Sequence, residues 1–153
     1  MKRLLSFFLI CLLLGIPTSN GQSYTAQKWQ EDLRYLQKTI HQEYPFLFKK
    51  TTAEAFDSKV ETLHSQIPEL EPHEIMVALA RLVASFEYGH TVLGYWEGKV
   101  PFHELPVVLY HYDDGVYLQG VHRDYQSLAG SRLVAIEGVP VAKALELMRP
   151  VVP

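Results

Sequence analysis

The sequence predicts an α+β fold, in which three helices come first and a small, mostly antiparallel sheet follows. Up to residue 89, apolar residues recur at steps of three and four, as on one face of a helix. From residue 90 onward, short runs of β-branched and aromatic residues alternate with glycine and aspartate turn signals. We therefore divide the chain into a signal peptide (1–22), a helical segment (23–89) and a β-rich segment (90–153).

The first 22 residues have the order of a secretory signal peptide. Lys2 and Arg3 precede an apolar run over residues 4–16, and small and polar residues follow it. The run is shorter than the roughly 20 residues that cross a bilayer, although an uncleaved N-terminal anchor is the alternative. We expect cleavage near Ser23, a periplasmic or extracellular location, and no membrane association afterwards. Cys11 is the single cysteine and leaves with this segment, so the mature chain has no disulfide.

The charge balance argues against nucleic acid as a partner. Cleavage removes two of the 14 basic residues and none of the 17 acidic ones, so the net charge of −3 becomes −5. The basic residues form no stripe with interleaved aromatic residues, which is the pattern typical of nucleic-acid binding.

Each of the three helices is predicted from its apolar face. The first runs over residues 27–44, with Trp29, Leu33, Leu36 and Ile40 on one side and Pro45 at its end. The second opens at residue 51 with a predicted capping box, Thr51 and Glu54; its apolar face comprises Phe56, Val60, Leu63 and Ile67.

The third helix, residues 71–87, has the widest apolar stripe and is expected to be the most buried. Leu79, with Leu82 or Val83, should lie in the core. Pro72 suits the first helical turn, and Gly89 suits a left-handed position after the last turn.

The β-rich segment is expected to contain four strands and a last helix. Residues 90–96 and 131–138 are the first and last strands, and "ELPVVLYHY" and "GVYLQGV" flank the "DDG" hairpin turn. The final helix begins at Val141 and reaches Pro153 without a capping signal. We expect the chain to be the front part of a longer one.

Most histidines in the sequence have no catalytic context. His41, His64 and His73 fall on polar positions of helices, and His103, His111 and His122 fall in the β-rich segment. None shows the close spacing of a local metal motif, so we predict no metal and no cofactor.

His90 stands at the junction between the third helix and the first predicted strand, with Gly89 before it and Thr91 after it. Histidine titrates nearest neutral pH, so a histidine on such a connection is a candidate general base. A polar residue at a turn is the simpler interpretation. Ser85 and Ser131 are candidate nucleophiles, but neither lies in a nucleophile-elbow motif.

Six short elements, in order, resemble the N-terminal part of the tail-specific (C-terminal processing) and tricorn-core family of serine peptidases. Tyr44 replaces a histidine of the family, and Glu87 stands one position before the family's usual acidic residue. The matched elements are Trp29, Asp32, Leu33 and Leu36; Pro45 and Phe48; Gly89, His90 and Thr91; Leu105 and Pro106; Asp114, Gly115 and Tyr117; and Gly130, Leu133, Ile136, Gly138, Pro140 and Val141. The last element is similar to the strands of a PDZ-like peptide-binding module.

The resemblance implies an exported serine-type peptidase (a hydrolase) that binds polypeptide substrates. In tricorn-like members the histidine matching His90 is the general base, whereas the tail-specific branch uses a Ser–Lys dyad. The nucleophilic serine would lie downstream, so this chain alone should be inactive. The alternatives are a non-catalytic exported peptide- or protein-binding module and a degraded gene fragment.

Overall fold

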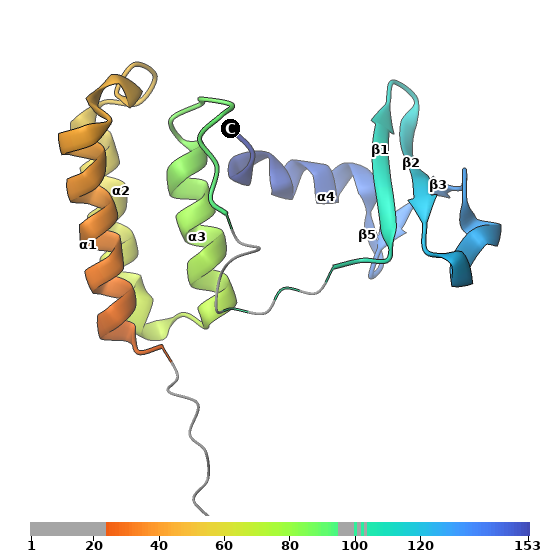
Figure 1. Cartoon of the computed structure of the whole chain (residues 1–153), viewed down its shortest axis with the longest axis horizontal. Helices are drawn as coiled ribbons and strands as arrows, with labels where there is room; N and C mark the ends of the chain where they lie inside the picture. The colour runs from red at the N-terminus through yellow and green to blue at the C-terminus, as the bar shows by residue number, and fades with distance from the viewer. Residues whose placement is uncertain (1–23, 95–99, 101, 103) are drawn as a thin grey trace, which may run out of the picture.

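The computed structural model describes residues 24–94, 100, 102 and 104–153. The predicted signal peptide and Cys11 lie outside the described residues. The fold is α+β, with helices first and antiparallel strands after them (Figure 1). The regular elements are α1 (Ala26–Glu43), α2 (Ala53–Gln66), α3 (Pro72–Ala84), β1 (Val107–Tyr112), β2 (Gly115–Val121), β3 (Arg132–Leu133), β4 (Ala135–Ile136), β5 (Val139–Pro140) and α4 (Val141–Met148), with short 3-10 helices η2 (Pro45–Leu47), η3 (Ile67–Glu69), η5 (Arg123–Leu128) and η6 (Arg149–Val151).

The core of the helical segment is built from the faces that the periodicity predicted. α1 contributes Leu33 and Ile40, and Trp29 and Leu36 pack beside them. The second helical face is buried throughout, from Phe56 to Ile67. α3 is the most buried helix, as expected, and the buried residues that it contributes are Ile75, Met76, Leu79, Leu82, Val83 and Ala84.

The helix starts are fixed by side-chain caps. The predicted capping box at Thr51 is wrong, because Thr52 is the N-cap of α2 and its hydroxyl accepts a hydrogen bond from the Ala55 amide at 3.2 Å. This register puts Glu54 one position too early to reach back to the cap amide. The capping box occurs instead on α3, between Glu71 and Glu74, with proline in the first turn as predicted.

Polar side chains join α1 to α2 above the apolar core. The Arg34 guanidinium donates to both carboxylate oxygens of Glu61, at 2.5 and 2.7 Å. This pairing raises the pKa of Arg34 and lowers that of Glu61. Asp57 accepts a hydrogen bond from Gln37 at 2.7 Å and contacts the His41 ring nitrogen at 2.8 Å. Its pKa is lowered, first by the Gln37 hydrogen bond and then by His41.

The predicted hairpin is confirmed. β1 and β2 pair antiparallel around the two-residue turn Asp113–Asp114, and β3 pairs with β2 on its other side. A side chain at Gly115 would collide with the Arg132 guanidinium, which donates to the Asp114 carbonyl at 2.6 Å. This close approach ties β3 to the hairpin turn.

Two strand predictions need correction. Residues 91–94 form no strand, and among the described residues the first strand begins at Val107. Leu93 packs instead against the helical core, which gives this apolar stretch a burial site outside a sheet. The predicted strand 131–138 is interrupted at Val134, and its second half pairs with β5 in a separate two-stranded sheet.

The last helix links the two halves of the described chain. α4 packs on β4 and β5, and η6 after it packs on α3. Figure 1 shows α4 running from the strands back toward α3. No helix among the described residues has both the length and the apolar character needed to cross a membrane.

Candidate functional site

His90 lies on an exposed turn that follows α3. The helix ends at Ala84 with Ser85 as its C-cap, and the Thr91 amide donates to the Tyr88 carbonyl at 2.8 Å to close the turn around residues 88–91. His90 itself is exposed to solvent. The structure thus confirms the predicted connection after the helix, but it places His90 in a turn and not at the start of a strand.

A buried aromatic cluster anchors this turn. Phe86, which precedes His90 by four residues, is 2% exposed. Its ring centroid lies 5.1 Å from that of Phe56 on α2 and 5.9 Å from that of Phe48, which follows η2. The centroids of Phe48 and Phe56 are 5.8 Å apart, so the three rings contact one another. The turn that carries His90 is therefore fixed to two other parts of the helical segment.

The predicted role of Gly89 as the helix C-terminal glycine is wrong. The residue with a positive φ after α3 is Glu87, at 49°, and Gly89 is not among the residues with positive φ. A side chain built at Gly89 would meet no atom within 4 Å. Glutamate pays a conformational cost at such a φ, because its Cβ crowds the backbone. The buried Phe86 beside it offsets that cost through packing.

His90 has no catalytic partner among the described side chains. Neither a hydrogen bond nor an ion pair joins its imidazole to another described residue. The Ser85 hydroxyl donates to the Leu82 carbonyl at 2.7 Å, as a helix-end serine commonly does. Glu87 is directed to Lys50, with 4.0 Å between the carboxylate and the ammonium. The geometry brings neither an acid nor a nucleophile to the candidate base.

Ser131 belongs to the sheet and not to a site with His90. Its amide donates to the Leu128 carbonyl at 3.0 Å, and its carbonyl accepts from the Leu118 amide at 3.0 Å. These contacts place the residue where η5 leads into β3. Its backbone thus continues the β2–β3 pairing, at the start of the predicted strand 131–138.

The other described histidines have structural surroundings. His41 contacts Asp57 between α1 and α2, and the His122 ring accepts a long hydrogen bond, 3.4 Å, from the Asp124 amide at the start of η5. His73 and His111 are exposed. His103 lies outside the described residues. No group of three or more histidine, cysteine, aspartate or glutamate residues in the described chain could hold a metal ion.

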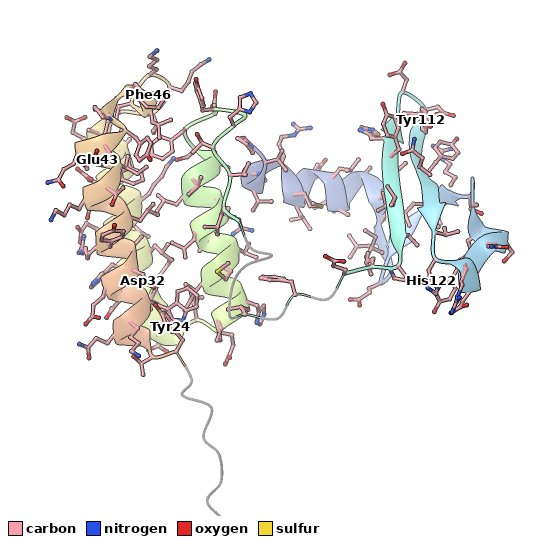
Figure 2. The ribbon with its side chains drawn as sticks, viewed as in Figure 1. Tyr24, Asp32, Glu43, Phe46, Tyr112 and His122 are labelled. Atoms are coloured by element: carbon pink, nitrogen blue, oxygen red, sulfur yellow. The ribbon has the colours of Figure 1, made fainter. Side chains whose placement is uncertain are left out.

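A second candidate surface is the outer edge of β1. The strand order β1–β2–β3 leaves one edge of β1 without a partner strand among the described residues. The side chains on both faces of β1 are also largely uncovered, including Tyr110 at 49% exposure on one face and Leu109 at 38% on the other. The Tyr110 and Tyr112 ring centroids are 4.6 Å apart, and Figure 2 shows Tyr112 near the hairpin turn, at the opposite end from His122.

An open edge with exposed aromatic side chains has the features of a surface that accepts an added strand. A register irregularity between Val108 and Leu109 interrupts the pairing with β2 near the start of β1. The extra residue is Gln119 on the inner strand β2, because Val108 pairs with Gly120 and Leu109 pairs with Leu118. The outer edge of β1 itself, from Val107 to Tyr112, carries no extra residue.

The segment that resembles PDZ-like strands forms turns and short strands. Gly130 and Gly138 have φ values of 78° and 81°, and Glu137 has a φ of 49°. Positive φ at both Glu137 and Gly138 is what a two-residue type I′ hairpin turn requires, and these two residues join β4 to β5. This hairpin was not predicted, because Glu-Gly is a weaker turn signal than Asn-Gly or Asp-Gly.

Comparison with known proteins adds no relative: no family model, no curated protein and no solved structure gives a significant match to this sequence.

Proposed function

We propose that this chain is the N-terminal part of an exported serine-type peptidase and that it binds polypeptide in an extended conformation along the outer edge of β1. The observation that supports the binding surface is that one edge of β1 has no partner strand among the described residues and that aromatic side chains on β1 are exposed. The peptidase part of the proposal is supported by the resemblance of the sequence motifs. Main-chain hydrogen bonds to such an edge would supply affinity, and the side chains at alternate positions would supply selectivity.

Peptide binding through a strand edge depends on the backbone of the ligand, which gives a direct test. A fluorescently labelled apolar peptide and the same peptide N-methylated at alternate residues would be titrated with the protein. We expect the N-methylated form to bind at least about tenfold more weakly, because it has lost the amide donors that pair with β1. Equal affinities for the two peptides would refute binding by strand addition.

A variant pair separates β1 from the remaining exposed aromatic surface. Tyr110→Ala removes a half-exposed ring from β1, and Tyr35→Ala removes a ring that is 72% exposed on α1. We expect weaker peptide binding for Tyr110→Ala alone. Equal loss of binding in both variants would show that the peptide adheres nonspecifically to exposed rings.

Under this proposal His90 is the general base, and a downstream part of the peptidase supplies the nucleophilic serine. His90 is exposed on a turn that is anchored at Phe86, which supports this role because its imidazole is accessible to a neighbouring domain. A general base contributes about 10²–10⁴ in rate. In a form of the peptidase that includes the nucleophile, His90→Ala should lower kcat by that order without loss of folding.

His73→Ala is the matched control, because His73 is exposed at the start of α3. It should leave kcat unchanged. Full activity of the His90→Ala enzyme would instead indicate a Ser–Lys dyad and a structural role for His90. Peptide hydrolysis by the 153-residue chain alone would contradict the proposal of a downstream nucleophile.

The second candidate function is a non-catalytic exported binding module. It is favoured because no described acidic or nucleophilic side chain forms a hydrogen bond or ion pair with His90. Reading the genomic DNA past the codon for Pro153 distinguishes the two candidates. An open frame that encodes a serine at a strand-to-helix turn supports the peptidase, and a stop codon supports the module.

A further inference from the structure

A pocket of about 700 Å³ lies between α2, α3 and η6. Figure 1 shows the C-terminal end of the chain close to α3. On α2 the pocket is lined by Ser58, Thr62 and Gln66, which are spaced four residues apart and therefore lie on one face of the helix. Eight residues of helix span about 12 Å, which is the length of roughly four residues of extended polypeptide.

Three basic side chains from three different elements line this pocket: Lys59 from α2, Arg81 from α3 and Arg149 from η6. None of the three forms an ion pair with a described acidic residue. By contrast, Arg34 is paired with Glu61 and Lys143 with Glu146. The pocket therefore contains three positive charges without an ion-pair partner among the described residues, although the net charge of the chain is −3.

Glu87 is the one acidic residue among the described residues that line the pocket, and its carboxylate is directed to Lys50, which is not among them. Positive charges gathered in one concave site repel each other and attract an anionic ligand. Arginine in particular presents a planar fork of donors that matches a carboxylate. The charge distribution thus favours a ligand with more than one acidic group.

The same pocket also has an apolar surface. Pro150 and Val152 of the C-terminal segment line it and are exposed, and the buried Leu63 and Leu82 lie at its base. A small, wholly polar anion would leave this apolar surface uncovered. A ligand that combines acidic groups with an apolar one would use both parts of the lining.

We propose that this pocket, here called the basic pocket, binds a polypeptide segment in which acidic side chains flank an apolar one. The acidic groups pair with Arg81, Arg149 and Lys59, and the apolar side chain lies against Pro150 and Val152. The basic pocket is built from α2, α3 and η6 and not from β1. Binding of an acidic peptide in the basic pocket therefore does not depend on strand addition at β1.

The test uses fluorescence anisotropy with a labelled peptide that has a pair of glutamates on each side of a leucine. The double variant Arg81→Gln/Arg149→Gln is compared with Lys38→Gln/Lys49→Gln. Both pairs are exposed, and neither Lys38 nor Lys49 has an ion-pair partner among the described residues, so the two variants lose the same charge. Far-ultraviolet circular dichroism verifies that both variants remain folded.

We expect the arginine double variant to bind the peptide about tenfold more weakly, because it loses two partly exposed ion pairs with the glutamates of the peptide. The lysine double variant should bind the peptide as the parent does. Binding should weaken as salt is raised, and a peptide with glutamine in place of glutamate should lose most of its affinity. Equal binding of the glutamine peptide, equal losses in the two double variants, or no binding of the glutamate peptide at millimolar protein would each overturn the proposal. So would complete displacement of the peptide by citrate at equal concentration, which would indicate a site for small polyanions.

Discussion

Replacing Phe86 with leucine tests whether the three-ring cluster holds the turn that carries His90. Leucine retains most of the apolar area but loses the ring contacts to Phe56 at 5.1 Å and to Phe48 at 5.9 Å. An aromatic pair contributes about 0.5–1.5 kcal/mol beyond burial, so the loss of two pairs predicts a decrease of about 1–3 kcal/mol in the free energy of unfolding. Urea unfolding followed by circular dichroism measures this free energy.

Tyr88→Leu is the control for this measurement. Tyr88 also has a ring neighbour, Phe46 at 6.0 Å, but both rings are nearly half exposed. Its replacement should change the free energy of unfolding by less than about 0.5 kcal/mol. A double-mutant cycle between Phe56→Leu and Phe86→Leu should give a coupling of about 0.5–1.5 kcal/mol. A stability of Phe86→Leu equal to the parent's, or a coupling of zero, would refute the assignment of the cluster as the anchor of the turn.

Three further measurements test other parts of the structure. Thr52→Ala should lower the free energy of unfolding by about 0.5–2 kcal/mol, because it removes the N-cap of α2. Thr51→Ala should have little effect in the same urea titration. A larger loss of stability for Thr51→Ala than for Thr52→Ala would show that Thr51 is the cap. Asp57 has a lowered pKa in the folded chain, so its stabilising contribution is present above the ordinary carboxyl pKa of 3.8 and is lost as the pH falls below it. The stability difference between the parent and Asp57→Asn should therefore shrink as the pH falls from about 5 to about 2, and a difference that stays the same over this range would contradict this. N-terminal sequencing of the exported protein should begin close to Ser23, and recovery of intact Met1 from the membrane fraction would show an uncleaved anchor.

The helical half could be predicted closely because its signals are local. Apolar residues at steps of three and four placed the buried faces of all three helices, and Asp113, Asp114 and Gly115 placed the hairpin turn. The wrong predictions concern positions where the sequence allows two similar local arrangements. Thr51 and Thr52 have the same side chain, and only the register of the folded helix selects one of them. The apolar residues after His90 could face a sheet or a helix, and packing against the helical core decided between them.

The candidate site could be predicted only in part, for a different physical reason. A histidine on a connection is visible in one sequence, and the turn at His90 follows the third helix as expected. The basic pocket could not be predicted, because Lys59 and Arg149 are 90 positions apart and meet only when η6 folds back onto α3. The spacing of residues along the sequence does not indicate a contact between segments so far apart.

The unequal burial of the two halves has a consequence for local opening. The buried cluster of the helical half extends from Leu33 to Phe86, whereas the described strands bury only Val116 and Leu118. Cooperative units with few buried contacts open at a lower free energy than the rest of a protein. In native-state hydrogen exchange, the amides of α2 and α3 should then exchange through global unfolding and those of β1 through local fluctuation. Binding of a ligand to the β1 edge would therefore slow the amide exchange of the hairpin. The exchange rates of the helices, which are already protected, would change little.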